Sequence, residues 1–218
     1  MLSMGFLIDH VFICTSVGAP AADALVAFGL TEGTPNRHPG QGTANRRFFF
    51  ENGMLELIWV ENPEEAQSEQ TRAMRLWERW SETGQGASPF GIILRPEPGP
   101  GEPCPFPSWE YRPPAMPELV LRVASETALS EPMWCLFDDV PTGRRRQPLG
   151  HAAGMRSITR VGLVCPGLGE SSVTASIAAR NIITLQPGDE HLLDVEFDAG
   201  KSGNRKDFRP DLPLVLRW

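Results

Sequence analysis

The sequence predicts an α+β protein made of two βαβββ modules, whose strands form a curved mixed sheet around a cavity. A strand-helix-strand-strand-strand pattern runs through residues 1–62, and a similar pattern returns in residues 155–218. The segment between them, residues 63–154, begins with a helical pattern and is then rich in proline, which favours short strands and loops. We therefore expect a first module, a Pro-rich middle insertion with extra strands, and a second, divergent module.

The first module follows from its apolar runs and turn residues. Gly29 is a suitable end for an Ala-rich helix, and Asn52-Gly53 between two apolar runs is a strong hairpin signal. The expected elements are a strand at 7–14, a helix at 19–28, a short strand near 29–34, and two strands at about 45–51 and 54–60.

The middle insertion begins with Pro63, a favourable first residue for a helix over about 64–82. Apolar residues form a stripe along that helix, which predicts that it covers a sheet. Strands are expected at 90–95 and 132–137. Trp109 and Tyr111 alternate with polar residues, and this alternation fits either a cavity wall or simple core packing.

The second module is predicted from a repeat of the first pattern. Ile158 to Cys165 can be laid over Ile8 to Cys14, and a helix at about 169–180 follows. Further strands are expected at 181–185, 191–198 and 212–217. Two such units can pair their sheets into one curved surface, so we expect residues 155–218 to supply the other half of the cavity.

Composition excludes several classes of protein. The 218 residues carry a formal net charge of -7, whereas binding to nucleic-acid phosphates requires a basic surface. No apolar run approaches the ~20 residues that span a bilayer, and Met1 to Phe6 lack the features of a secretory signal. The four cysteines are scattered, which favours free thiols in a reducing compartment. We expect a cytoplasmic protein with a small-molecule ligand and no nucleic-acid or membrane partner; a homodimer is compatible with the sequence.

His10 and Glu56 are the first candidate site residues, because each interrupts an apolar strand-like run. Ionisable groups are seldom buried there without a partner. Strand alternation places His10 on one face with Ile8 and Phe12, and Glu56 on one face with its neighbours at i±2. If the two strands are neighbours, a nitrogen and an oxygen ligand face a common ion, which could be Zn, Fe, Mn, Ni or Co.

These motifs resemble the vicinal oxygen chelate superfamily, which includes glyoxalase I, extradiol dioxygenases and fosfomycin- and bleomycin-resistance proteins. The resemblance is carried by Ile8-Asp9-His10-Val11 and by Met54-Leu55-Glu56-Leu57-Ile58. More narrowly, His38-Pro39-Gly40-Gln41-Gly42-Thr43-Ala44-Asn45 followed by Leu55-Glu56-Leu57-Ile58 is similar to the bacterial glyoxalase-like domain branch. The resemblance is clear over about residues 7–62 and continues at Phe90-Gly91-Ile92 and Trp109 to Pro114.

The resemblance implies a metal held by the first and last strands of each module. His10 and Glu56 occupy two of those positions, and Asp194 or Glu196 occupies the last-strand position of the second module. The remaining position holds Arg160, which cannot bind a cation. Three accounts stay open: one acidic residue completes the metal site, a loop histidine (His38 or His191) completes it, or Arg160 pairs with Glu56 and makes an organic-anion pocket. A buried polar network of Arg160, Glu56 and His10 would also explain the residues.

Six residues are candidates for substrate binding. They share an aromatic, amide or cationic side chain near the expected cavity, and they are His38, Asn45, Arg47, Trp59, Trp109 and Arg160. Arg47 suits a carboxylate or phosphate. Two of the assignments have alternatives: Trp59 faces either the cavity or the helix side, and the His38 loop either contributes to the pocket or only connects strands.

The resemblance implies a metal-assisted lyase, isomerase or dioxygenase that acts on a small oxygen-rich metabolite, in which Glu56 doubles as the base. The alternative is a metal-free protein that sequesters a drug or metabolite in a degenerate metal site. A third hypothesis is a vestigial pocket in a protein that acts through an interface. The number of good ligands around His10 discriminates between the first two.

Overall fold

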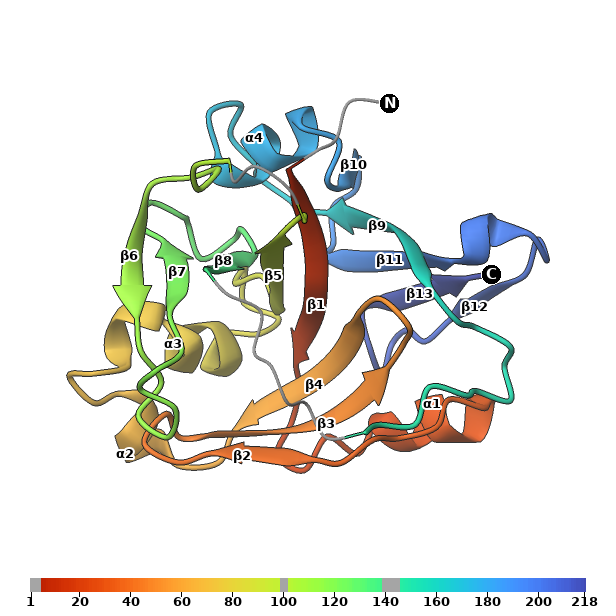
Figure 1. Cartoon of the computed structure of the whole chain (residues 1–218), viewed down its shortest axis with the longest axis horizontal. Helices are drawn as coiled ribbons and strands as arrows, with labels where there is room; N and C mark the ends of the chain where they lie inside the picture. The colour runs from red at the N-terminus through yellow and green to blue at the C-terminus, as the bar shows by residue number, and fades with distance from the viewer. Residues whose placement is uncertain (1–4, 99–101, 139–145) are drawn as a thin grey trace.

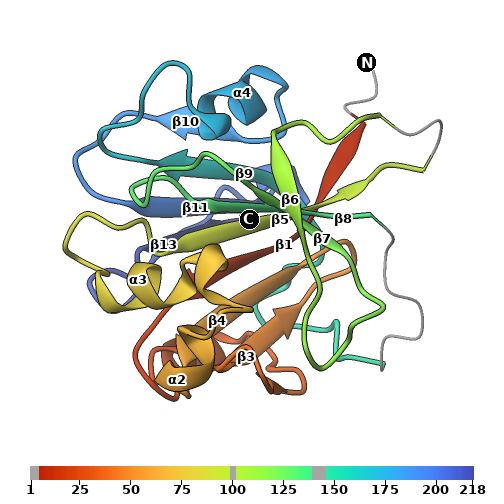
Figure 2. The same ribbon diagram turned by 90° about the vertical axis from the view of Figure 1, so that its left-hand side faces the viewer.

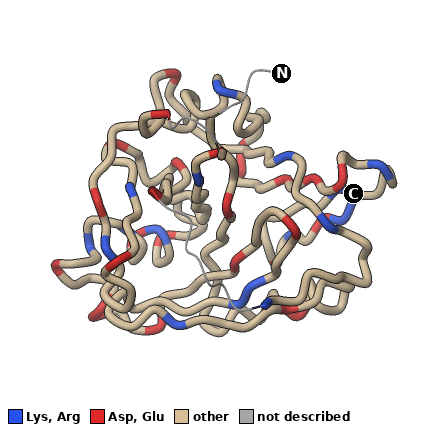
Figure 3. Tube along the Cα trace, in the orientation of Figure 1, with Lys and Arg blue, Asp and Glu red and all other residues tan. Residues whose placement is uncertain are grey.

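A computed structural model of the chain describes residues 5–98, 102–138 and 146–218. Residues 1–4, which enter the expectation about a secretory signal, lie outside the described residues. Within the described part, none of the helices has the length and apolar character needed to cross a bilayer. Acidic and basic positions are interspersed along the trace (Figure 3).

The described residues form two β-sheets with a few short helices (Figure 1), so the α+β class is confirmed. The first sheet has the strand order β2-β3-β4-β1-β5-β8-β7-β6. Its strands are β1 (Phe6–Cys14), β2 (Asn36–His38), β3 (Thr43–Phe49), β4 (Met54–Val60), β5 (Phe90–Pro96), β6 (Ser108–Tyr111), β7 (Leu121–Ala124) and β8 (Met133–Phe137).

The second sheet has the order β10-β9-β11-β13-β12. Its strands are β9 (Ile158–Val164), β10 (Thr184–Gln186), β11 (Leu192–Phe197), β12 (Arg205–Asp207) and β13 (Leu214–Arg217). The helices are α1 (Ala22–Phe28), α2 (Pro63–Ala66), α3 (Leu76–Ser81) and α4 (Val173–Ala179), with 3₁₀ turns η1 (Arg72–Met74) and η2 (Asp198–Gly200).

The first sheet consists of two matching halves that meet at β1 and β5, which pair antiparallel. In one half β1 pairs parallel with β4, and β3 and β2 follow outward; in the other half β5 pairs parallel with β8, and β7 and β6 follow. The hairpin predicted at Asn52-Gly53 is confirmed by the antiparallel pairing of β3 with β4. The second half is therefore built from residues 90–137.

The prediction that residues 155–218 supply the other half of the curved sheet is wrong. Those residues form the second sheet, which packs as a separate layer over the first (Figure 2). Val161 and Val195 from the second sheet and Ile13 from β1 belong to one hydrophobic core between the layers. A strand pattern identifies strands but not their pairing partners, which is why the repeat at Ile158–Cys165 pointed to the wrong sheet.

Strand β1 contains a β-bulge at Asp9. Ile8 pairs with Leu94 and His10 pairs with Ile93, so Asp9 is an extra residue with no partner of its own on β5. The bulge reverses the alternation of side chains: Ile8 packs against the core between the sheets, whereas His10 lines the opposite face. The expectation that Ile8 and His10 share a face is therefore wrong.

Two other expected elements also differ from the structure. The helix predicted over 64–82 is broken into α2, η1 and α3, because the Thr71 hydroxyl donates to the Glu65 carbonyl and Arg75 adopts a left-handed conformation. The short strand predicted near 29–34 is found instead at Asn36–His38.

Candidate functional site

A cavity of about 570 Å³ lies on the face of the first sheet opposite the second sheet, and both halves of the first sheet line it. The first half contributes mainly polar side chains, and the second half contributes mainly apolar ones. The polar lining includes Asp9, His10, Asn36, His38, Asn45, Arg47 and Glu56; the apolar lining includes Ile93, Leu119, Leu121, Met133, Cys135 and Phe137. The cavity is therefore polar on one wall and apolar on the other.

His10 and Glu56 face each other across the polar wall. Because β1 and β4 are parallel neighbours, both side chains project from the same face, as predicted. His10 Nε2 lies 3.6 Å from Glu56 Oε2. The other Glu56 oxygen, Oε1, accepts a hydrogen bond from the Asn45 side-chain amide, and Asn45 Oδ1 accepts one from the backbone N–H of Asn36.

Asp9 contacts the opposite side of the His10 ring. Its Oδ1 lies 2.8 Å from His10 Nδ1, and Arg95 Nε on β5 lies 3.8 Å from its Oδ2. Asp9 is only 3% exposed. Bulges near binding sites commonly redirect a side chain, and this one brings the carboxylate beside the imidazole of the next residue. Asp9 and His10 thus form a contact pair within one strand.

The remaining polar residues on the first-half wall are held by hydrogen bonds. His38 Nδ1 lies 2.9 Å from Thr43 Oγ1, and burial lowers the pKa of His38 below its usual value. The Arg47 guanidinium donates to the Thr34 carbonyl at 2.9 Å from Nε and 2.7 Å from Nη2, and it lies over the Phe49 ring. These contacts fix His38 and Arg47 in the cavity wall.

The second half contributes one polar residue with a clear partner, Tyr111. Its hydroxyl donates to Gln41 Oε1 at 3.1 Å and thereby links β6 to the loop between β2 and β3. Burial raises the pKa of the Tyr111 hydroxyl above its usual value. Tyr111 lines the cavity, whereas Trp109 packs against the aromatic ring of Tyr111 outside the cavity lining. Of the two aromatics weighed from the sequence, Tyr111 belongs to the site.

The residues opposite His10 and Glu56 do not complete a divalent-metal site. The strand register aligns His10 with Ile93 on β5, and Ile93 with Cys135 on β8. The Ile93 side chain has no atom that can bind a metal ion. Burial raises the pKa of the Cys135 thiol to about 12, so this thiol stays protonated near neutral pH, whereas a metal ligand must be a thiolate. Catalytic zinc sites use three protein ligands. His10 and Glu56 supply two, and among the described residues no group of three or more His, Cys, Asp or Glu side chains lies together so that it could hold a metal ion.

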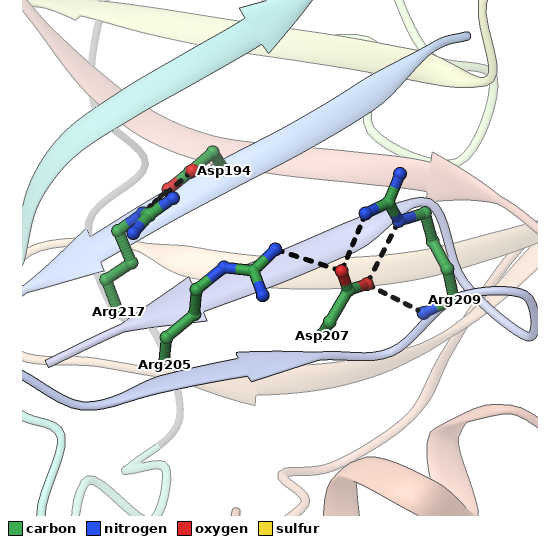
Figure 4. A network of polar contacts seen from close by, with 5 residues as sticks. All are labelled: Asp194, Arg205, Asp207, Arg209 and Arg217. Atoms are coloured by element: carbon green, nitrogen blue, oxygen red, sulfur yellow. Dashed lines mark hydrogen bonds and ion pairs between the residues drawn. The ribbon is translucent and has the colours of Figure 1, made fainter.

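The predicted ligands Asp194 and Glu196 do not lie in this cavity. Both belong to β11 of the second sheet, where Asp194 receives hydrogen bonds from Arg217 at 2.8 and 2.9 Å. Figure 4 shows this pair beside a group of three residues, in which Asp207 lies between Arg205 and Arg209. Glu196 pairs with Arg160 at 3.1 Å. Asp194 and Glu196 are therefore used within the second sheet.

Arg160, His191 and Trp59 are also placed away from the main cavity. Arg160 lines a separate small cavity of about 170 Å³ between the sheets and pairs with Glu196, so the account in which it pairs with Glu56 is wrong. His191 Nε2 lies 3.4 Å from the Gly86 carbonyl oxygen, and its ring packs against Phe90 of the core between the sheets, outside the cavity lining. Trp59 packs against the core between the sheets, because odd positions of β4 face away from the cavity.

Of the predicted site residues, the structure brings together His10, His38, Asn45, Arg47 and Glu56. Asp9 was not identified as a site residue from the sequence. Its position next to His10 was the available signal, but strand alternation predicts that neighbours point apart, and the bulge that overrides this alternation is set by the pairing with β5.

Comparisons with known proteins agree with this architecture. Residues 8–97 match a family model described as a glyoxalase-like domain. Among 34 matching chains of solved structures is the crystal structure of a hypothetical protein from Staphylococcus aureus, which is 11% identical. The likeness covers 97% of this chain and 98% of that chain with a TM-score of 0.54, and it shows the fold alone. No curated protein matches the chain.

Proposed function

We propose that this chain, whose residues 8–97 match a family model described as a glyoxalase-like domain, is a protein of the vicinal oxygen chelate type that binds a small organic molecule without a resident metal. The ligand has a polar head group and an apolar body. One observation carries this proposal: the cavity has a polar wall at His10 and Glu56 and faces it with an apolar wall at Ile93, Met133 and Phe137.

The size and lining of the cavity support a small-molecule ligand. Binding pockets for such ligands are typically of roughly 300–1,000 Å³, mainly apolar, with a few polar groups that orient the ligand. The cavity of about 570 Å³ falls within this range. Glu56 and Asn45 are buried at the polar end and already hydrogen-bonded to each other, so their geometry is fixed before a ligand arrives.

A blocking variant tests this proposal. Leu121→Trp places a bulky side chain on β7, where Leu121 lines the cavity and is half-buried. Leu185→Trp is the matched control, because Leu185 is exposed on β10 of the second sheet. We expect compounds that raise the melting temperature of the wild type and of the control to have a much smaller effect on Leu121→Trp.

The measurement is a thermal-shift screen of small amphipathic molecules, followed by calorimetric titration of the hits. Failure of every amphipathic compound to bind the wild type would contradict the proposal. Equal binding to wild type and Leu121→Trp would place the ligand elsewhere and would also contradict it.

The second candidate function is a metal-assisted lyase, isomerase or dioxygenase that acts on an oxygen-rich metabolite. It is favoured by one observation: His10 Nε2 and Glu56 Oε2 face each other at 3.6 Å, and both atoms are of kinds that bind divalent metal ions. Metal content of protein purified without added ions, measured beside His10→Ala, distinguishes the two candidates. Stoichiometric metal that is lost in the variant supports this second candidate; no metal in either protein, even after reconstitution, supports the metal-free one.

We further propose that the protein works in the cytoplasm on a small-molecule ligand. The cysteines Cys14, Cys104, Cys135 and Cys165 are all free, as is usual in a reducing compartment. The net charge of -7 is unfavourable for contacts with nucleic-acid phosphates. Sedimentation analysis tests whether the protein forms a homodimer.

A further inference from the structure

We propose that the polar end of the cavity selects ligands whose head group donates hydrogen bonds, a hydroxyl or a protonated amine. Asp9 fixes His10 as a hydrogen-bond acceptor beside the Glu56 carboxylate, so the ligand meets two acceptors. This inference rests on the proposed binding function and deepens it by naming the class of head group.

The contact with Asp9 determines which nitrogen of the neutral His10 ring carries the hydrogen. An ionised carboxylate can only accept hydrogen bonds, and Asp9 Oδ1 lies 2.8 Å from His10 Nδ1. In the neutral imidazole, Nδ1 therefore carries the hydrogen and donates it to Asp9, which leaves a lone pair on Nε2. Nε2 is the nitrogen that faces Glu56 in the cavity wall.

The strand bulge and Arg95 hold the Asp9 carboxylate in place. The bulge at Asp9 brings its side chain to the ring of the next residue, and Asp9 as a whole is 3% exposed. Arg95 on the neighbouring strand places a guanidinium nitrogen 3.8 Å from the other Asp9 oxygen. The carboxylate thus lies between Arg95 and the His10 ring, which leaves it little freedom to turn away.

Asn45 orients the Glu56 carboxylate. The Asn45 side chain has a fixed orientation, because its oxygen accepts from the Asn36 N–H at 2.8 Å and its amide nitrogen therefore faces Glu56 Oε1. This contact leaves Oε2 directed toward His10 Nε2, at 3.6 Å. That separation exceeds the usual hydrogen-bond range of about 2.7–3.2 Å, so no direct hydrogen bond joins Nε2 to Oε2 and both atoms remain available to a ligand.

A ligand that donates fills this arrangement. A hydroxyl can donate to one of the two acceptors, and an ammonium can donate to both at once. A carboxylate or ketone would place a third acceptor against Nε2 and Oε2, and such mismatches are rejected strongly in buried sites. The apolar wall at Met133 and Phe137 then takes the body of the ligand.

A matched series of ligands tests the selection. The probes are 3-phenylpropan-1-ol, 3-phenylpropylamine, 3-phenylpropanoate, 4-phenylbutan-2-one and propylbenzene, which share one apolar body. We expect the alcohol, the amine or both to bind at least about tenfold more tightly than the carboxylate and the ketone. The alcohol and amine arms identify which donor is preferred.

Equal affinity for donor and acceptor head groups, or tighter binding of the carboxylate, would overturn the inference but leave the binding function intact. Binding of propylbenzene and of none of the other probes would also overturn the inference and leave the binding function intact. If none of the five probes binds although the thermal-shift screen yields other ligands, this inference fails and the proposed function stands; if the screen also yields no ligand, both fail.

Variants separate selection from a structural role. In Asp9→Asn the amide can donate to Nδ1, which moves the ring hydrogen to Nε2 and turns the cavity end into a donor. We expect the preference to shift toward the ketone and the carboxylate. Glu56→Gln should reduce the preference for donors, and the exposed Asp211→Asn is the control.

Nitrogen NMR of the folded proteins reads the His10 tautomer directly, without a ligand. The wild type should carry the hydrogen on Nδ1, and Asp9→Asn should carry it on Nε2. A hydrogen on Nε2 in the wild type would overturn the inference, as would an unchanged ligand preference in a folded Asp9→Asn.

Discussion

Glu56 and Arg79 are both buried and charged, but their side chains have different surroundings. Glu56 faces the cavity, where a ligand can reach it. Arg79 on α3 instead donates to three backbone carbonyls, those of Ser88, Leu129 and Glu131. These carbonyls precede β5 and β8, so Arg79 ties the helix to the ends of two strands. The charge of Arg79 is therefore structural, whereas that of Glu56 is available for binding.

Replacement of Arg79 tests this structural role. Arg79→Leu removes the guanidinium donor from three carbonyls, of which the Leu129 carbonyl keeps the Ser88 N–H as a donor, and we expect the free energy of unfolding to fall by about 2–4 kcal/mol. Urea denaturation measures the change. Arg72→Leu is the control, since Arg72 is exposed. Equal stability of the two variants would show that the Arg79 contacts contribute little.

Single elements in this fold are interrupted where the chain must redirect side chains. The bulge in β1 brings Asp9 to His10, and the break between η1 and α3 occurs at Arg75. Arg75 has φ of 56° and ψ of 30°, a left-handed conformation that is unfavourable for residues with a Cβ atom. The break divides the apolar stripe that the sequence assigned to one helix.

The conformation of Arg75 leads to a test with two glycine variants. Arg75→Gly is expected to leave stability unchanged or to raise it by up to about 1 kcal/mol, because glycine adopts a left-handed conformation freely. Arg72→Gly, in the helical turn η1, should lower stability by about 0.5–1 kcal/mol. Thermal and urea unfolding compare them. A larger loss in Arg75→Gly than in Arg72→Gly would contradict this account.

At the scale of the molecule, the two sheets share one core and one set of buried polar contacts. Thr174 on α4 donates to Glu131 through its hydroxyl at 2.9 Å and accepts from Trp134 Nε1 at 2.9 Å. Val161 and Val195 of the second sheet pack in the same cluster as core residues of the first. The second sheet therefore belongs to the fold and covers the side of the first sheet that faces away from the cavity.

His151 leads to a pH-dependent prediction at this scale. It joins two segments of the first module: its Nδ1 accepts from the Thr31 N–H at 2.9 Å, and its Nε2 donates to the Phe49 carbonyl at 3.0 Å. Burial lowers the pKa of His151 from 6.5, and it also lowers the pKa values of His38 and His191. The unfolded state then binds more protons below pH 6.5, so stability falls as the pH drops below that value.

We expect the free energy of unfolding to decrease between pH 7 and pH 5, and to decrease less in His151→Gln. Urea denaturation at a series of pH values measures both slopes. Some dependence should remain in the variant, because His38 and His191 still contribute. The same slope in both proteins would contradict the role assigned to His151.

The sequence by itself determined the strands and helices that carry strong local signals. These include the hairpin at Asn52-Gly53, the helix ended by Gly29, and the pairing of His10 with Glu56 on one face. Such features depend on turn chemistry and on side-chain alternation within short segments, and both can be read from neighbouring residues.

Only the tertiary structure decided which strands form the second half of the cavity. Residues 90–137 and residues 158–217 both contain apolar strands, and the choice depends on long-range pairing that leaves no local mark. The same pairing creates the bulge at Asp9 and places Ile93 and Cys135 opposite His10, where the repeat had suggested Arg160 and an acidic residue. Most of the polar half of the cavity was therefore predictable from the sequence, except for Asp9, and its apolar half was not.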